Sequence, residues 1–100
     1  MKYPFFTALD LAHNQVADLA PLAGLAQLTS LDLTDNRISD IEPLAQLRRL
    51  RLLNLDNNLL SDIGALMGLR LLRDLELSGN PLVDLADVEA LADRGVQVRY

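Results

Sequence analysis

The only histidine is the first residue to test for chemistry, because imidazole is the side chain that most readily moves protons near neutral pH. His13 has no cysteine to activate in this chain of 100 residues, and no serine stands in a nucleophile-elbow motif. The five glycines are scattered and form no phosphate-binding loop. The geometry allows a contact between His13 and Asp35, and we interpret such a contact as incidental. We therefore expect no enzymatic activity, no catalytic residue and no cofactor.

Acidic side chains recur at a fixed interval and could face either a cation or a basic protein. Asp10, Asp32, Asn54 and Glu76 follow one another every 22 residues. Metal ions such as Ca²⁺ need six or more oxygens converging at about 2.3–2.6 Å, which a flat row does not supply, so we expect no metal site. Two interpretations stay open, namely solvent-facing residues without a ligand and a surface that docks a basic partner. The candidate partner-binding residues are Asp10, Asp32, Asp35, Leu52, Asn54, Asp56, Asp74 and Glu76.

Arginines gather beside these acids in the second half of the chain. Salt bridges to Asp74 and Glu76 are one interpretation, and a free basic surface next to the acidic one is the other. This basic ridge consists of Arg48, Arg49, Arg51, Arg70 and Arg73.

Three leucines stand where the equivalent positions are mostly polar. They are Leu52, Leu59 and Leu71. Single exposed leucines are common on protein surfaces, whereas three near one another would form a candidate hot region for binding.

The overall charge limits the class of partner. The chain has 14 acidic and 9 basic residues, a net charge of -5, and therefore does not suit nucleic acid, which requires clustered basic residues. No apolar run approaches the roughly 18–20 residues of a membrane span, and the N-terminus lacks signal-peptide organisation. Without cysteine the chain forms no disulfide. We expect a cytoplasmic protein that contacts no membrane and binds a protein with a basic surface.

An internal repeat sets the positions of all these residues. Asparagine recurs every 22 residues, and the repeat units are 6–27, 28–49, 50–71 and 72–93. Seven offsets are apolar in every unit, so all 28 framework positions are apolar in a chain whose composition is 50% apolar. In the second unit these positions are Leu28, Leu31, Leu33, Ile38, Ile41, Leu44 and Leu47.

Residues 28–49, which read LTSLDLTDNRISDIEPLAQLRR, resemble the 22-residue leucine-rich repeats of phosphatase-regulator and internalin-type proteins. The resemblance covers 88 of the 100 residues. It implies an α/β solenoid, a right-handed coil with a short parallel sheet on the concave face and 3₁₀ or short helical turns on the convex side. We expect one domain over residues 1–100 that closes with a C-terminal helix and strand, and residues 94–100 are the C-terminal cap after the fourth unit.

Elementary physical chemistry accounts for the fixed positions within each unit. In Leu31-Asp32-Leu33 the alternation sends the leucines inward and the aspartate outward, as in a strand. The amide after each strand both donates and accepts, which predicts a structural ladder of Asn14, Asn36, Asn58 and Asn80. Four residues later an aspartate can cap the return turn, in which Pro21 and Pro43 also fit. These aspartates are Asp18, Asp40, Asp62 and Asp84.

The C-terminal end has the signals of a closing helix. Asp84 or Asp87 can act as its N-cap, and Gly95 falls where the helix should stop. Val96 and Val98 then alternate with polar residues, one position out of the repeat register, which predicts a short final strand. The positions with helical spacing are Leu85, Val88, Leu91 and Ala92.

The N-terminal end has only five residues before the first unit, although terminal coils normally need a cover. Tyr3, Pro4 and Phe5 can supply an aromatic cover, a partner can supply it, or the chain is a fragment of a longer protein. Self-association through Tyr3, Phe5 and Phe6 is a related hypothesis.

Two functions therefore stay open for this chain. The first is a module that binds a partner on its acidic strand surface. The second is a structural or assembly element that associates through its poorly covered first coil.

Overall fold

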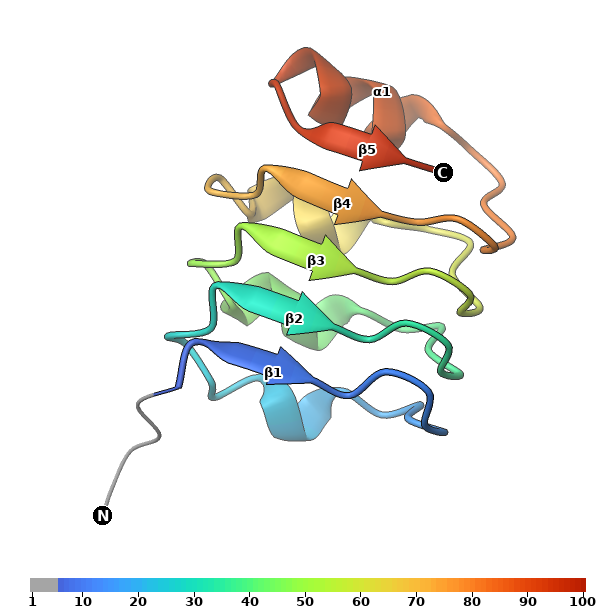
Figure 1. Cartoon of the computed structure of the whole chain (residues 1–100). Helices are drawn as coiled ribbons and strands as arrows, with labels where there is room; N and C mark the ends of the chain where they lie inside the picture. Colours follow the sequence, from blue (N-terminus) through green and yellow to red (C-terminus); the bar gives the residue numbers. More distant parts are fainter. Residues whose placement is uncertain (1–5) are drawn as a thin grey trace.

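The computed structural model describes residues 6–100, which form successive coils with one strand each. The strands lie in one parallel sheet in the order β1-β2-β3-β4-β5, with the helical segments behind it, as Figure 1 shows. The expected solenoid is confirmed. Its strands are β1 (Ala8–Asp10), β2 (Ser30–Asp32), β3 (Leu52–Asn54), β4 (Asp74–Glu76) and β5 (Gln97–Arg99). Its helices are the 3₁₀ helices η1 (Ala20–Leu22), η2 (Glu42–Gln46) and η3 (Gly64–Gly68) and the α-helix α1 (Ala86–Asp93).

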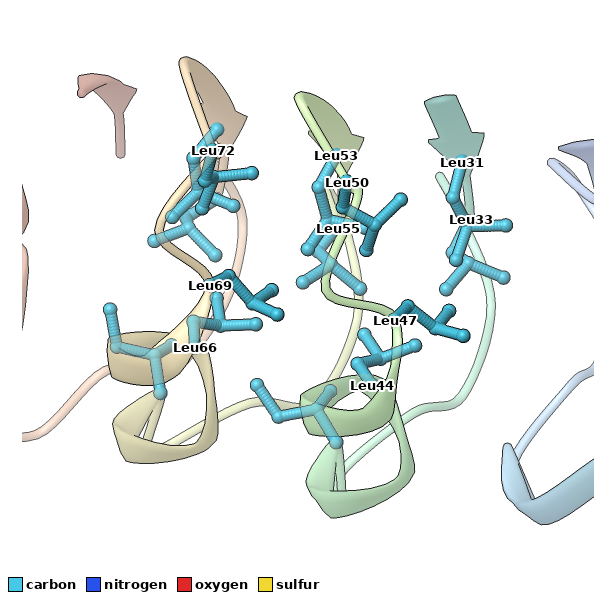
Figure 2. Packing of buried hydrophobic residues seen from close by; sticks show 14 of the residues in the cluster. Leu31, Leu33, Leu44, Leu47, Leu50, Leu53, Leu55, Leu66, Leu69 and Leu72 are labelled. Carbon is cyan, nitrogen blue, oxygen red and sulfur yellow. The ribbon is translucent and has the colours of Figure 1, made fainter. Parts of the chain in front are cut away.

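The strand register follows the sequence repeat, so equivalent leucines stack between sheet and helices. Leu31 pairs with Leu9 on one side and with Leu53 on the other, each 22 residues away. Every framework residue of the second and third units is buried, and Figure 2 shows several of these leucines filling the interior. Burial of one such side chain stabilises the fold by about 1.5–3 kcal/mol. The interior is thus one continuous aliphatic stack.

Buried asparagines join successive coils where the strands end. The Oδ1 atom of Asn36 accepts a hydrogen bond from the backbone N–H of Val16, one coil earlier, at 2.9 Å. Its Nδ2 group donates to the carbonyl oxygens of Leu11 in that coil and Leu33 in its own, both at 3.0 Å. Asn58 makes the same set of contacts one coil further along. Each of these amides therefore satisfies backbone groups of two coils at once.

The two ends of this ladder differ from its middle. Asn80 is partly buried and keeps the pattern, with the N–H of Leu60 at 3.0 Å and the carbonyl oxygen of Leu55 at 2.8 Å. Asn14 is exposed, and its Nδ2 group donates only within its own coil, to Leu11 and Ala12. Asn14 therefore does not join two coils as the predicted ladder requires, because no earlier coil covers it within residues 6–100.

An aspartate accepts a hydrogen bond from the first N–H of each helical segment. Because each aspartate stands two residues before that N–H, it forms a local turn that presets the start of the helix. The N-cap residue of α1 is Leu85, so the expectation that Asp84 or Asp87 is the N-cap is wrong. Asp84 stands one residue earlier and accepts the hydrogen bond from Ala86, whereas Asp87 lies inside the first turn. The pairs are Asp18 with Ala20, Asp40 with Glu42, Asp62 with Gly64 and Asp84 with Ala86, at 2.7–2.9 Å.

The C-terminal helix ends in a turn that directs the chain into the last strand. The N–H of Val96 donates to the carbonyl oxygen of Leu91, and the N–H of Gly95 donates to that of Ala92. Gly95 has φ +95°, so these two bonds form a Schellman motif with glycine at the left-handed position. The following strand β5 pairs with β4 at an offset of 23 residues, not 22, as the shifted valines predict. Leu85, expected in the core, is 39% exposed because it precedes the helix.

The first coil is the least buried part of the described chain. Of its seven framework residues only Leu19 is buried, while Phe6 is 40% exposed. The others are partly buried against the second coil. Tyr3, Pro4 and Phe5, which are central to the aromatic-cover hypothesis, lie outside the described residues.

Candidate functional site

The outward side of the sheet, here called the strand face, carries the acidic row predicted from the sequence. The register pairs Asp10 with Asp32, Asp32 with Asn54, and Asn54 with Glu76. Neighbouring parallel strands lie about 4.8 Å apart, so these side chains form one row across the sheet. The row continues to Arg99 of β5, which forms an ion pair with Glu76. Arg99 was not among the predicted site residues, since its place depends on the one-residue shift of β5.

Most side chains of this row also stabilise their own coil. Oδ1 of Asp10 accepts a hydrogen bond from the N–H of Ala12 at 2.9 Å. Oδ1 of Asp32 accepts from the N–H of Thr34 at 3.0 Å and from its hydroxyl at 2.6 Å. Oδ1 of Asn54 accepts the equivalent hydrogen bond from the N–H of Asp56 at 2.9 Å, so an amide oxygen can replace the carboxylate oxygen in this turn. In these three coils one side-chain oxygen is thus used by the turn after the strand, which explains why either Asp or Asn can occupy the position.

A shallow hollow lies at the middle of the strand face. Its volume is about 200 Å³, and it spans β2, β3 and β4. Leu52, at its centre in the sheet, is 47% exposed and has Ser30 and Asp74 as its direct neighbours across the strands. The structure thus brings together five of the eight predicted residues around this hollow. They are Asp32, Leu52, Asn54, Asp74 and Glu76.

The remaining acids of the predicted set have neighbours of their own. Asp10 lies at the end of the row on β1. Oδ1 of Asp56 accepts a hydrogen bond from the N–H of Ser78 in the next coil at 2.8 Å. Oδ2 of Asp35 lies 3.1 Å from Nδ1 of His13, and both side chains are exposed. The contact between His13 and Asp35 therefore joins two surface turns.

The residues beside these acids hold an unusual backbone conformation that the sequence analysis missed. One residue per coil, three positions after each of the first four strands, has positive φ, a region that non-glycine residues other than Asn, Asp and His seldom adopt. The signal was present, because this column contains only residue types that tolerate it. The residues are His13 (φ 60°), Asp35 (φ 58°), Asn57 (φ 57°) and Gly79 (φ 75°).

The basic ridge does not form the salt bridges considered for it. Within residues 6–100 the two ion pairs are those of His13 with Asp35 and of Arg99 with Glu76. Arg51 and Arg73 are exposed, and each stands just before its strand. The ion pair with Glu76 is formed by Arg99 instead. The basic ridge is therefore an exposed row of guanidinium groups.

The three exposed leucines do not form one patch. Leu52 belongs to the hollow on the strand face. Leu59 follows the end of β3, whereas Leu71 precedes the start of β4, so the two lie at opposite edges of a parallel sheet. The hypothesis that the three leucines form one hot region is therefore wrong. Leu52 alone remains a candidate contact on the strand face.

Two further features bear on the class of site. Among residues 6–100 no group of three or more His, Asp or Glu side chains is arranged to hold a metal ion. Within the same residues, no helix combines the length and the apolar character that spanning a membrane requires.

Comparison with known proteins agrees with this architecture. Two family models, each described as a leucine rich repeat, match residues 26–82 and residues 4–19. No match to the chain is found among curated proteins.

Several solved structures are similar to the chain. An internalin from Listeria monocytogenes is 29% identical over 94% of this chain, with a TM-score of 0.75. Internalin C2 from the same bacterium is 30% identical over 92%, with a TM-score of 0.74. The leucine-rich repeat ectodomain of a receptor kinase from Arabidopsis thaliana is 28% identical over 91%, with a TM-score of 0.69. This chain spans 34%, 51% and 53% of those three chains.

Proposed function

Because this chain belongs to the leucine-rich repeat family, we propose that it is a protein-binding module whose strand face holds a partner with a basic surface. Leucine-rich repeat proteins are typically modules for protein interaction and are generally not enzymes. The finer assignment, to this face and to a basic partner, is our own.

The observation that carries the proposal is the hollow around Leu52. An exposed apolar side chain stands there among the carboxylates of Asp32, Asp74 and Glu76. Asp32 lies on β2 and the two other carboxylates lie on β4, so they flank the uncharged strand β3 on both sides. A cationic group placed over β3 is attracted by the carboxylates on both sides, which lowers the free energy of the bound state. Lysine and arginine have apolar stems as well as charged heads. A basic side chain can therefore cover Leu52 with its stem and bring its charge to the acids.

The local hydrogen bonds make this face rigid before a partner arrives. Asp32 is held by Thr34, so that one carboxylate oxygen is fixed while the partner approaches the other. A fixed side chain loses less conformational entropy on binding than a mobile one. The net charge of -5 further favours encounter with a basic protein.

A paired set of variants tests the proposal. The strand-face variant carries two substitutions, Asp32→Asn and Leu52→Ser. The asparagine can still accept the hydrogen bond of the turn, as Asn54 does in the next coil. Serine is the residue that the neighbouring strand has at the equivalent position, Ser30. The control Val83→Ser, Glu89→Gln also removes one carboxylate and one exposed apolar side chain, but near α1. Each protein is used to capture partners from a native lysate, and its binding to a 12-residue peptide of alternating Lys and Ser is measured by fluorescence anisotropy.

The proposal requires that the strand-face variant lose both the captured proteins and the peptide, while the control variant keeps them. Equal loss in both variants would indicate a diffuse effect of charge. Retention by the strand-face variant would show that partners bind elsewhere.

A second candidate function follows from the first coil. Its framework residues Leu9, Leu11 and Val16 are only partly buried, and Phe6 is 40% exposed. Such a surface favours an assembly element that associates with another copy or another domain. Sedimentation equilibrium over a wide range of concentration tests this candidate, with a Phe5→Ser, Phe6→Ser variant as the comparison. Association that the variant abolishes supports assembly, and a monomer at all concentrations removes self-association.

A further inference from the structure

Six of the nine basic residues lie along one edge of the sheet, at the entry to the strands. All five strands are parallel, so their first residues share one edge and their last residues the other. We call the first the arginine edge, which is the basic ridge extended by Arg94. It consists of Arg48, Arg49, Arg51, Arg70, Arg73 and Arg94, all of them exposed.

A backbone hydrogen bond and two shared hollows place these arginines side by side. The backbone N–H of Arg73 donates to the carbonyl oxygen of Arg51 at 2.8 Å, so the two are direct neighbours in adjacent coils. Arg48 and Arg70 line one hollow of about 620 Å³, and Arg70 and Arg94 line a second of about 400 Å³. Arg70 therefore stands at the centre of a row that crosses three coils.

The positive charges in this row have no counter-charge in the described structure. Within residues 6–100 none of the six guanidinium groups takes part in an ion pair. Asp74 and Asp93, the carboxylates nearest in sequence to Arg73 and Arg94, form none with them either. Aligned like charges on neighbouring strands repel each other, and an anionic ligand would remove that repulsion.

We propose that the arginine edge is a second docking surface, which binds an extended acidic segment of a partner protein. Alternate residues of an extended chain lie about 6.6–6.8 Å apart, a spacing that long arginine side chains on coils about 4.8 Å apart can follow. The guanidinium group binds a carboxylate through two parallel hydrogen bonds. The hollow beside Arg48 and Arg70 has small residues in its lining, Ala45, Ala65 and Gly68, which leave room for the segment.

Nucleic acid fits this edge less well than an acidic protein segment. Binding of single strands relies on aromatic side chains that stack on bases, and the four aromatic residues of this chain are all among positions 1–6 or at position 100. The acidic row lies at the other end of the short strands, about 7–10 Å away. It repels a strand with a charge on every nucleotide more strongly than a peptide with a charge on every second residue.

The first test changes charge. We measure binding of a 12-residue peptide of alternating Glu and Ser to the full chain by ¹⁵N NMR titration at low ionic strength. Arg70→Gln should weaken binding about three- to fivefold, as expected for loss of one exposed ion pair. The control is Arg37→Gln, which removes one exposed charge next to Asn36, outside the arginine edge. It should change the affinity for the peptide less than about twofold. Equal effects of the two variants would overturn the proposal.

The second test changes shape and leaves the charge unaltered. A Cβ atom at Gly68 would meet no other atom within 4 Å, and the same is true of Gly24, its equivalent in the first coil. Gly68→Phe fills the hollow and should weaken peptide binding several-fold, whereas Gly24→Phe should leave it unchanged. Unaltered binding to Gly68→Phe, or tighter binding of a 12-residue oligothymidylate than of the peptide, would contradict the proposed site. Melting temperatures of all variants verify that each is folded.

Discussion

Oδ1 of Asn58 accepts a hydrogen bond from the buried backbone N–H of Ile38 at 3.1 Å, and this bond ties the third coil to the second. The same amide donates to the carbonyl oxygens of Leu33 and Leu55. Loss of the side chain would leave these groups unsatisfied in a site where Asn58 is 4% exposed. We expect Asn58→Ala to lower the free energy of unfolding by about 1–3 kcal/mol, measured by urea denaturation.

Asn14 supplies the matched control for this substitution. It is exposed, and its side chain donates to Leu11 and Ala12 of its own coil, so Asn14→Ala should lower the free energy of unfolding by about 0.5 kcal/mol or less. A loss of only a few tenths of a kcal/mol in Asn58→Ala would show that water replaces the amide.

Replacement of Gly79 by alanine should destabilise the fourth coil. Its φ of 75° is left-handed, and a Cβ atom there would come within 2.2 Å of Oδ1 of Asn57. We expect Gly79→Ala to lower the free energy of unfolding by about 1–2 kcal/mol. Gly24→Ala is the control, because its Cβ atom would enter open space. Thermal melts that do not separate the two variants would refute this account of the turn.

Binding to the strand face should depend on salt. The acids around Leu52 are partly exposed, and charges separated by more than about 10 Å are largely screened at 0.1 M ionic strength. A basic partner should therefore bind more weakly as salt increases, mainly through a slower association rate. Surface plasmon resonance across a salt series measures both. An affinity independent of salt would point to Leu52 as the main contact.

The first coil should exchange its backbone amide protons faster than any other coil. The framework residues Leu9, Leu11 and Val16 are only partly buried, whereas those of the second and third units are buried. Hydrogen exchange resolved by residue should show this order in dilute samples. If coil one associates with another copy, protection should increase with concentration. Uniform protection from Leu9 to Leu91 in a demonstrated monomer would remove the motivation for the assembly hypothesis.

The repeat made the fold predictable to the level of single residues. The interval between leucines predicts the register of Leu9, Leu31 and Leu53, because a parallel sheet can stack equivalent coils in only one way. The closing helix and the shift of β5 were also predictable from helical spacing, Gly95 and the two valines. These features depend on local signals that the sequence contains directly.

The candidate site was predictable only in part, because contacts between side chains depend on small differences in position. The sequence places Asp32 outward but does not show that Thr34 holds one of its oxygens. It aligns Arg73 with the acids, yet Glu76 pairs with Arg99, which reaches the row through one extra residue. Leu52 and Leu71 look alike in sequence but lie on different surfaces.

The asparagine ladder fixes the number of residues in each coil. Each amide reaches back 20 residues to an N–H and 25 residues to a carbonyl, so only whole coils of 22 residues can be added without a change in these offsets and in the strand register. A duplicate of residues 28–49 should instead be accepted as one more coil, longer by one strand spacing of about 4.8 Å. It would add a carboxylate to the acidic row and raise the urea midpoint. Evolution and protein engineering can thus extend this binding surface in discrete steps, one recognition position at a time.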